Sequence, residues 1–425
     1  MTTVQEIKNI VSNAIDANAD RIEAIAHTVW RNPEPGFREV KTAKLAAETL
    51  RSLGLPVKEG LAVTGLRADL DSGREGPRFA ILGEMDSLII PEAAEADPES
   101  GAFHGCGHHT HITAMLGAAI GLTAPGVREA LSGSVAFIGC PAEECVEMDY
   151  RLELLKSGKI GSVSGKPALI RAGVFDDVDM AAMIHNGYDF GAMDSNAFVL
   201  KRVRFIGKSS HAAIPHGGIN ALSAANLALH AIALLRETFS HDPRCRVHGM
   251  ITKGGDAVNV IPGDVRMEYQ IRASNAKSLQ KISAQFDQAM EGCAMAMGAQ
   301  TEVETIIGDH AMTNDRDLYR LYLDIAQDVF GEDCEYRISP EPGSTDMGDV
   351  SAIMPAIHPF CTGAAGHCHG ADFHIPDTRA TCVKMAKTLA LLAVELLYGN
   401  ADKGKIFAQR KKEHLTIEEY LKVQS

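Results

Sequence analysis

Apolar residues near the start of the chain recur at helical spacing. From Val4 to Trp30, isoleucine, valine and alanine return every three or four positions, which predicts an amphipathic helix. The stretch Asn32–Gly36, with two prolines and a glycine, ends this pattern. Further helical patterns and short apolar runs typical of strands then alternate, at Val40–Leu53, Gly65–Leu70, Phe79–Leu82, Thr113–Leu122 and Ser134–Ile138. This alternation predicts an α/β domain with a mostly parallel sheet and helices on both faces.

The middle third of the chain has a different order of patterns. A strand, a helix, two strands, a helix and a strand are predicted at Ala197–Ile206, Ile219–Thr238, Val247–Thr252, Val265–Ala273, Ala276–Met297 and Gln300–Ile307. This βαββαβ order is that of a small ferredoxin-like domain. We therefore predict an inserted domain over residues 197–307, between a first part (1–196) and a second part (308–425) of the larger domain.

Bulk composition narrows the functional classes. The 425 residues exceed what one compact core usually holds, which favours more than one domain. The net charge of −14 argues against a nucleic-acid partner, since phosphate binding needs a basic face. No apolar run reaches the roughly 20 residues that span a bilayer, and Met1–Ala17 lacks the pattern of a secretory signal. Nine scattered cysteines indicate a reducing compartment, so we expect a cytoplasmic protein that binds neither membranes nor nucleic acid.

The densest group of metal-binding side-chain types is the segment His104-Gly105-Cys106-Gly107-His108-His109-Thr110-His111. Thiolates and imidazoles are preferred ligands of zinc and similar divalent transition metals. The segment precedes a predicted helix, whose N-terminus would help to keep the thiol of Cys106 deprotonated. The alternative is a glycine-rich turn with incidental histidines, which four histidines and one cysteine in eight residues disfavour.

Two adjacent carboxylates follow a predicted strand in the segment Pro141-Ala142-Glu143-Glu144. Side chains that leave a strand alternate in direction, so one carboxylate can bind a metal while the other faces a substrate. We assign Glu144 as the ligand and Glu143 as the general base, although alternation alone does not choose between them. For an isolated pair of glutamates, a solvated acidic turn would be the better interpretation.

Histidines occur at two further places in the larger domain. His185 ends an apolar run, where α/β proteins often place functional groups, although a core histidine is equally compatible with this pattern. His367, His369 and His374 form a late cluster. Spacing alone does not indicate which of these three binds a metal.

Two weaker candidates lie outside these segments. His211 follows a strand of the predicted inserted domain, where it could reach a reacting group or serve a local hydrogen bond. The segment Pro342–Asp346 offers backbone donors and two hydroxyls, a combination that can hold a carboxylate.

In their order these motifs resemble the metallo-aminoacylase and carboxypeptidase family. That family includes hippurate hydrolases, plant indole-acetyl-amino-acid hydrolases and aminobenzoyl-glutamate hydrolases. The similarity extends from Arg31 to His369, and Lys166–Ile170 and Phe175–Asp179 are most similar to the aminobenzoyl-glutamate hydrolase branch. The resemblance implies that Glu143 is the catalytic base and acid. It implies five metal ligands, namely Cys106, His108, Glu144, His185 and His369.

The resemblance also implies roles for the inserted domain and for the substrate-binding loops. The family's small domain makes dimers and acts as a lid, so we expect a homodimer or a higher homo-oligomer. His211 would then reach a neighbouring subunit's active site and stabilise the oxyanion. Asn259 matches a substrate-binding asparagine, and Gly343, Ser344 and Thr345 match a loop that binds the carboxylate of a small-molecule substrate.

Some positions depart from the family pattern. Many relatives have aspartate where this chain has His109, and Glu84 replaces a residue that some branches use as a histidine ligand. Asp86 is still placed to orient a group that binds the metal, and we expect the same outer position for His109. One or two ions per subunit are compatible with these changes. The thiolate and imidazoles favour zinc, nearby oxygen donors favour manganese, and cobalt or nickel are permitted.

The resulting hypothesis is a metal-dependent hydrolase of carbon–nitrogen bonds. A metal-activated water would give its proton to Glu143 and attack the amide of an N-acyl or aminobenzoyl amino acid. In an alternative chemistry, known for a nitroanthranilate aminohydrolase with this general architecture, the same groups would release ammonia from an electron-poor aromatic ring. A second alternative, a non-catalytic binding protein on the same fold, is disfavoured because Glu143 and all five implied ligands are present.

Overall fold

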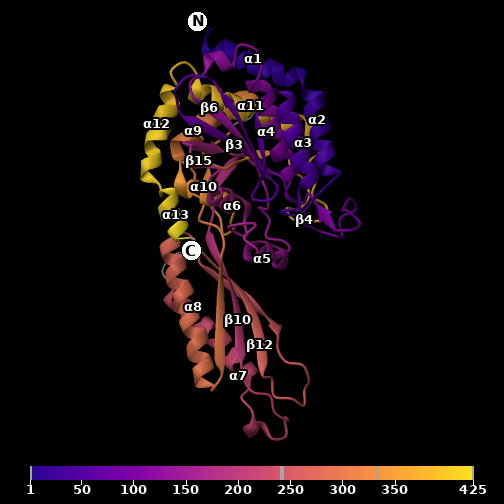
Figure 1. The fold of residues 1–425 in the computed structure, drawn as a ribbon, viewed down its shortest axis with the longest axis vertical. Helices are drawn as coiled ribbons and strands as arrows, with labels where there is room; N and C mark the ends of the chain where they lie inside the picture. The colour runs from indigo at the N-terminus through magenta and orange to yellow at the C-terminus, as the bar shows by residue number, and fades with distance from the viewer. Residues whose placement is uncertain (1, 240–243, 332–333, 424–425) are drawn as a thin grey trace. The chain divides into compact units, whose positions relative to one another are not determined.

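The computed structural model describes residues 2–239, 244–331 and 334–423 (Figure 1). The chain divides into two compact units. The first unit comprises Met1–Asp194, Thr313–Pro340 and Asp349–Ser425. The second unit comprises Ser195–Met312 and Glu341–Gly348. The predicted insertion at residues 197–307 lies within the second unit, whereas the grouping of Glu341–Gly348 with that unit had no signal in the sequence.

Six strands form the central sheet of the first unit. In sheet order they are β1 (Val57–Leu61), β2 (Gly65–Asp71), β6 (Ser134–Cys140), β3 (Arg78–Glu84), β7 (Met180–Ala182) and β15 (Ala356–Ile357). Neighbours from β6 to β15 run parallel, whereas β2 is antiparallel to both of its neighbours, β1 and β6. Glu84 at the end of β3 pairs with Cys140 at the end of β6, so both strands end at the same edge. The prediction of an α/β fold with a mostly parallel sheet is confirmed.

Shorter strands and many helices complete the first unit. A second sheet has the order β14 (Ile338–Pro340), β9 (Gly191–Asp194), β16 (Pro359–Thr362) and β8 (His185–Gly187), and β4 (Leu88–Ile89) pairs with β5 (Ala102–Phe103). The helices are α1 (Val4–Ala17), α2 (Ala19–Trp30), α3 (Val40–Ser52), α4 (His108–Leu122), α5 (Met148–Lys156), α6 (Gly165–Arg171), α9 (Arg316–Phe330), α11 (Thr378–Leu397), α12 (Asp402–Arg410) and α13 (Ile417–Val423). Helix α10 (Met347–Ile353) begins in the second unit and continues in the first. No helix among the described residues is long and apolar enough to cross a membrane.

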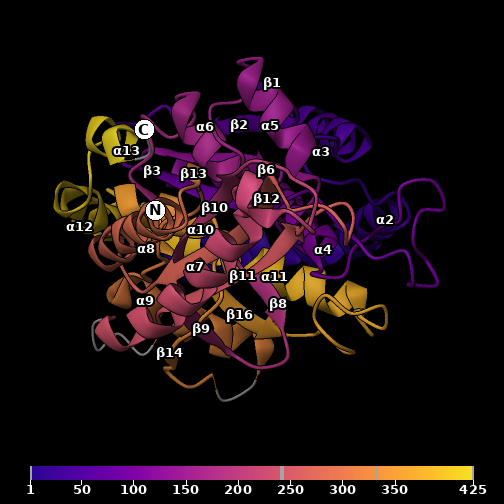
Figure 2. The same cartoon turned by 90° about the horizontal axis from the view of Figure 1, so that it is seen from below.

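Helix α4 is the central helix of the first unit, and all its residues are buried. It packs on β3 and against α1, α2 and α11, which can be followed in Figures 1 and 2. Two glycines permit this close packing. A Cβ at Gly117 would lie 2.7 Å from the Cβ of Ala386 in α11, and one at Gly121 would lie 2.8 Å from the side chain of Ile15 in α1. Because α4 is enclosed in this way, its first turn is held firmly at the edge where β3 and β6 end.

Two boundaries differ from the sequence-based prediction. The helix predicted from Val4 to Trp30 is interrupted at Asn18, whose backbone leaves the helical region and whose side chain donates to the carbonyl of Ala14 (2.8 Å). This is the competing local hydrogen bond that asparagine offers. Helix α4 begins at His108, five residues before the predicted start at Thr113. Gly107 precedes it with φ of +85°, a conformation that glycine adopts without strain.

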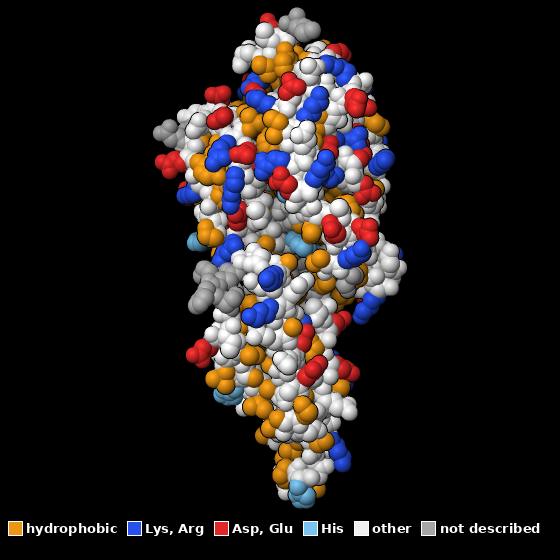
Figure 3. Space-filling view, turned by 90° about the vertical axis from the view of Figure 1, so that its left-hand side faces the viewer, with side chains coloured by type: hydrophobic (Ala, Val, Ile, Leu, Met, Phe, Trp, Pro, Cys, Tyr) orange, Lys and Arg blue, Asp and Glu red, His pale blue; other side chains and the backbone are white. Residues whose placement is uncertain are grey.

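The second unit has the βαββαβ order of elements. These are β10 (Ala197–Ile206), α7 (Ala221–Leu235), β11 (Arg246–Lys253), β12 (Asp264–Ala273), α8 (Ala276–Ala296) and β13 (Gln300–Ile307). All neighbours in the sheet, in the order β11, β12, β10, β13, are antiparallel. Alternate residues of β10 and β12 are buried against α7 and α8, which form the unit's own core. Hydrophobic side chains are also visible on the surface of this unit (Figure 3).

Candidate metal centre

The ends of β3 and β6 bring three carboxylates to one place in the first unit. Asp86 lies two residues beyond β3, and Glu143 and Glu144 lie just beyond β6. Asp86 is fully buried, and one of its oxygens accepts a hydrogen bond from the backbone N–H of Glu144 (2.9 Å). The parallel pairing of the two strands therefore fixes the loop after β6 against the loop after β3.

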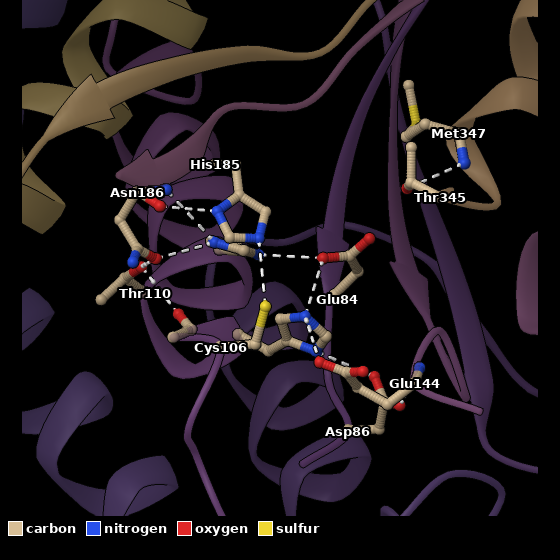
Figure 4. A network of polar contacts seen from close by, with 12 residues as sticks. Glu84, Asp86, Cys106, Thr110, Glu144, His185, Asn186, Thr345 and Met347 are labelled. Carbon is tan, nitrogen blue, oxygen red and sulfur yellow. Dashed lines mark hydrogen bonds and ion pairs between the residues drawn. The ribbon is translucent and has the colours of Figure 1, made fainter. Parts of the chain in front are cut away.

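His108, the first residue of α4, and Cys106, in the loop just before the helix, lie at this edge. Cys106 is labelled in Figure 4. Nδ1 of His108 lies 3.0 Å from Oδ1 of Asp86, so the carboxylate orients the imidazole. Nε2 of His108 is buried and makes no hydrogen bond within the described residues. It lies 3.9 Å from Oε1 of Glu144, and the ligand atoms of Cys106, His108 and Glu144 are all within 4.8 Å of one another.

His185 and His369 complete the set. Nε2 of His185, on β8, lies 3.4 Å from Sγ of Cys106, and its Nδ1 lies 2.6 Å from the carbonyl of Asn186. His369 has φ of +62°, and its backbone N–H donates to the carbonyl of Gly105 (2.9 Å). This bond ties the late histidine loop to the loop that carries Cys106. Nε2 of His369 thereby comes within 3.3 Å of Oε1 of Glu144.

The other two late histidines lie apart from this set. Nδ1 of His367 pairs with Asp372 (2.8 Å) on the surface, and Nδ1 of His374 lies 2.9 Å from the carbonyl of Asp372. The fold thus distinguishes His369 from its neighbours, which spacing could not do.

The donors fit a divalent transition metal. A buried imidazole nitrogen without a hydrogen bond, a thiol, two further imidazoles and a carboxylate converge, and this mixture suits such an ion. Burial lowers the pKa of His108, but the carboxylates of Glu84 and Asp86 outweigh burial and hold that pKa well above its usual value. The hydrogen bond with Cys368 and burial together raise the pKa of the Cys106 thiol. Binding of a metal ion at these groups would therefore be coupled to the loss of protons.

The loop that carries Glu143 is held in a strained conformation. Ala142 has φ of +53°, which residues other than glycine rarely adopt. Its N–H donates to Glu39 (2.7 Å), and its carbonyl accepts from the guanidinium of Arg151 (3.0 Å). Arg151 is fully buried and also donates to the carbonyls of Val163 and Glu144. These contacts fix the direction in which Glu143 leaves the loop.

Glu39 is itself unusual, because its carboxyl is fully buried. Burial and the nearby Asp86 raise the pKa of Glu39 to about 8, so near neutral pH it is mainly protonated. The hydroxyl of Thr64 lies 2.5 Å from the second oxygen of Glu39. Nothing in the pattern around Glu39 in the sequence distinguished it from a surface glutamate at the start of α3.

Glu143 is half-buried, and its carboxylate lies within 4.8 Å of that of Glu84. Glu84 belongs to a buried cluster that reasoning from the sequence missed. Its oxygens contact Lys166 Nζ (2.6 Å) and His111 Nδ1 (3.0 Å), and His111 Nε2 contacts the side chain of Asn186 (2.8 Å). The histidine-rich motif was a signal for His111, whereas Lys166 was noted only within a segment similar to one branch of the family, and nothing indicated that it is buried beside Glu84.

The side chain of His109 lies in an aromatic group. Its ring packs against Trp30 (centroids 4.8 Å apart) and His104 (5.3 Å apart), and all three side chains form an aromatic group. Burial lowers the pKa of His104 to about 3 and that of His109 well below its usual value, so both rings are neutral. A role for His109 around the metal stays a prediction.

The predicted residues of the second unit form two local groups. His211 and Asn259 are exposed, and the N–H of Ala212 donates to the carbonyl of Asn259 (2.9 Å), which places the two loops side by side.

The second group is the turn at Gly343–Thr345. The carbonyl of Gly343 accepts from the N–H of Asn196 (2.8 Å), and Ser344 Oγ accepts from Arg272 (3.0 Å). Thr345 Oγ1 accepts from the N–H of Met347 (3.3 Å) and Thr345 O from that of Gly348 (3.0 Å), which fixes this turn. The first of these two bonds is drawn in Figure 4.

Comparisons with known proteins identify the family. Residues 80–395 match the model of peptidase family M20/M25/M40. Human Xaa-Arg dipeptidase is 28% identical over 421 residues, which cover 91% of this chain and 88% of the relative. One of the p-aminobenzoyl-glutamate hydrolase polypeptides of Escherichia coli K12 is 33% identical over 313 residues, which cover 71% of this chain and 60% of the relative.

Solved structures show the same fold. The aminobenzoyl-glutamate utilization protein of Klebsiella pneumoniae has a TM-score of 0.68 at 21% identity and covers 91% of this chain and 98% of its own. A dinuclear metal-binding M20 peptidase of Bacillus subtilis has a TM-score of 0.66 at 23% identity and covers 90% and 99%. The family match covers most of the chain and confirms the resemblance seen in the motifs. This chain belongs to peptidase family M20/M25/M40 and is a divalent-metal hydrolase that acts on carbon–nitrogen bonds.

Proposed function

We propose that this chain hydrolyses the amide bond of an N-acyl or aminobenzoyl amino acid. The observation that carries the proposal is that Cys106, His108 and Glu144 offer ligand atoms within 4.8 Å of one another beside the loop of Glu143. Nε2 of His185 lies 3.4 Å from Cys106 Sγ, and Nε2 of His369 lies 3.3 Å from Glu144 Oε1. The similarity to a p-aminobenzoyl-glutamate hydrolase polypeptide supports the substrate class. A plant IAA-amino acid hydrolase, 27% identical over 360 residues, also acts on an amino-acid conjugate by its name.

These five residues would hold the metal ion. One thiolate and three imidazoles favour zinc, and the carboxylate of Glu144 makes manganese the second choice. When bound, such an ion lowers the pKa of a water molecule toward neutrality and polarises the substrate carbonyl. Asp86 has a positioning role, because it orients His108 and also holds the backbone of Glu144.

Glu143 is proposed to move the proton. It takes a proton from the water molecule, and the hydroxide attacks the amide carbon. Glu143 then returns that proton to the amide nitrogen, the carbon–nitrogen bond breaks, and an amine and a carboxylic acid leave, the acid giving its proton to the amine or to water. The contacts of Ala142 with Glu39 and Arg151 keep Glu143 in one direction throughout, which general acid–base catalysis requires.

His211 is proposed to stabilise the oxyanion in the active site of a neighbouring subunit. The N–H of Ala213 donates to Nδ1 of His211 (3.1 Å), which leaves the proton of a neutral ring on Nε2, free to donate. Ile214, Val258 and Val260 around it are exposed in the single chain, Val258 fully. Such apolar exposure is typical of a surface that another subunit covers, which supports a homodimer.

The substrate carboxylate would bind to groups of the second unit. Gly343, Ser344 and Thr345 form a turn held by backbone bonds, and Asn259 offers an amide next to His211. Arg272 donates to Ser344 Oγ and also to the carbonyl of Pro342 and to Gln270 Oε1, so a positive charge lies beside the turn. Guanidinium groups pair strongly with carboxylates, which supports a substrate that carries one.

Product analysis by mass spectrometry tests the substrate class. The metal-loaded chain would be given N-acyl amino acids, p-aminobenzoyl-glutamate and nitro-substituted anthranilates in separate reactions. We expect release of a free amino acid and the matching acid from one of the first two. Release of ammonia and a hydroxylated ring from an anthranilate, with no amide cleaved, would contradict amide hydrolysis and identify an aromatic aminohydrolase.

Complementation between two inactive variants tests the role of His211. His211→Ala and Glu143→Gln chains are each expected to be nearly inactive. If His211 acts across the dimer, co-expression yields mixed dimers with one complete site, and activity returns to about a quarter of the wild-type value. His216→Ala, an exposed histidine on the same loop, is the control and should be active alone. Mixed dimers without activity would contradict a role across subunits.

A further inference from the structure

A second group of ligand atoms lies next to the proposed metal centre. Glu84, His108, His111 and His185 offer atoms that all lie within 4.8 Å of one another. The group shares His108 and His185 with the centre, so by donor type alone it could hold another ion. Its only carboxylate is Glu84, which is 1% exposed.

Glu84 already has a positive partner inside the fold. Nζ of Lys166, a side chain with 0% exposure, lies 2.6 Å from Oε1 of Glu84. The other oxygen, Oε2, lies 3.0 Å from Nδ1 of His111 and 3.3 Å from Nε2 of His108. Both oxygens of the carboxylate are thus engaged (Figure 4 shows the contacts of Oε2).

The backbone prevents Lys166 from moving away. Helix α6 begins at Gly165, whose N–H donates to the carbonyl of Ala142 (3.2 Å). A Cβ at Gly165 would lie only 1.6 Å from the carbonyl oxygen of Pro141, so the helix start is pressed against the loop that carries Glu143. Lys166 is the second residue of this helix, so its backbone is held beside that loop, and its buried ammonium is held by Glu84.

A divalent ion in the second group would have to sit beside this ammonium. The ion and the ammonium of Lys166 would repel each other strongly, because charges in a buried site are screened little by solvent. If the lysine were absent, the buried carboxylate of Glu84 would need another cation. The two cations therefore compete for the same carboxylate.

We propose that Lys166 is a built-in cation at Glu84 that takes the place of a second metal ion, so that this centre holds one divalent ion per chain. The proposal rests on the metal centre described under the proposed function. By this proposal the chain holds fewer metal ions than its structural neighbour from Bacillus subtilis, which is described as dinuclear.

Counting bound ions tests this proposal without an activity assay. Metal-free wild type, Lys166→Met and the double variant Glu84→Gln/Lys166→Met would be loaded with Zn²⁺ or Mn²⁺ and freed of excess ion. Native mass spectrometry then gives the ions per chain. We expect one ion in the wild type, two in Lys166→Met, and one in the double variant, which lacks the carboxylate. Lys403→Met, which removes an exposed lysine paired with Glu395, is the charge control and should hold one.

Three results would overturn the proposal. These are two ions in the wild type, one ion in a Lys166→Met chain with a normal circular dichroism spectrum, or fewer than one in the double variant, because Glu84 would then be a ligand. The double variant replaces a buried ion pair by neutral groups of similar size, so it tests the proposal even if Lys166→Met does not fold. A wild-type chain that binds no ion would instead contradict the metal centre itself.

Discussion

Replacing Glu143 with glutamine is expected to lower kcat by about 10³-fold, within the range that general acid–base catalysis contributes. Glutamine keeps the size of the side chain but cannot take a proton from water or return one to the amide nitrogen. KM should change little, because Glu143 is not among the groups proposed to bind the substrate carboxylate. The bound ion should remain, because Glu143 is not among the five proposed ligands. Steady-state kinetics and native mass spectrometry on the same sample measure both quantities.

Two neighbouring glutamates provide matched controls for this prediction. Glu144→Gln alters a buried proposed ligand and should weaken metal binding as well as activity. Glu153→Gln alters an exposed residue of α5 and should change neither. A Glu143→Gln chain that turns over at the wild-type rate would show that another group is the base. Loss of the ion from that variant would show that Glu143 is a ligand.

The fold class could be predicted from the sequence because the apolar residues that become buried recur at regular spacing along the chain. Strands β10 and β12 alternate buried residues with less buried ones over most of their length, and β10 and β13 begin and end as predicted. The break at Asn18 could not be predicted in the same way, because apolar spacing continues through it from α1 into α2. Only the hydrogen bond of the Asn18 side chain to the backbone identifies it.

Some residues of the candidate site could likewise be predicted from the sequence and others could not. Dense or paired polar residues such as Cys106, His108 and Glu144 were recognisable, because few structural roles require them together. His369 could be chosen among three histidines only by the family resemblance, and the bond from its backbone to Gly105 now gives a physical reason. The buried ion pair of Lys166 could not be predicted, since a buried lysine is recognised by its carboxylate partner, which lies 82 positions away in the chain.

The loop around Ala142 is a further feature that sequence patterns do not contain. Its positive φ depends on contacts with Glu39 and Arg151, which come from helices α3 and α5 and from distant parts of the sequence. Strain of this kind persists only where surrounding structure holds it, and it is common at active sites. The sequence-based assignment assumed that Glu143 and Glu144 alternate in direction as in a strand. In the structure both residues lie in an irregular loop after β6.

Removing the metal is expected to abolish activity, which is the second large effect. Without the ion, Glu143 faces a water molecule whose pKa is far above neutrality, and the substrate carbonyl is not polarised. A chelator followed by gel filtration should yield a folded but inactive chain. The fold should survive because the first unit has an extensive apolar core of its own, formed around α4 and α11.

The measurement that tests the central claim most directly is a titration of this metal-free chain with Zn²⁺ or Mn²⁺. The rate of carbon–nitrogen hydrolysis on the best substrate and the ions bound per chain would be measured at each point. The account predicts no detectable rate in the metal-free chain and a rate that rises in proportion to bound ion, by at least about 10³-fold. A chain verified to be free of metal that hydrolyses the substrate as fast as the loaded chain would contradict it.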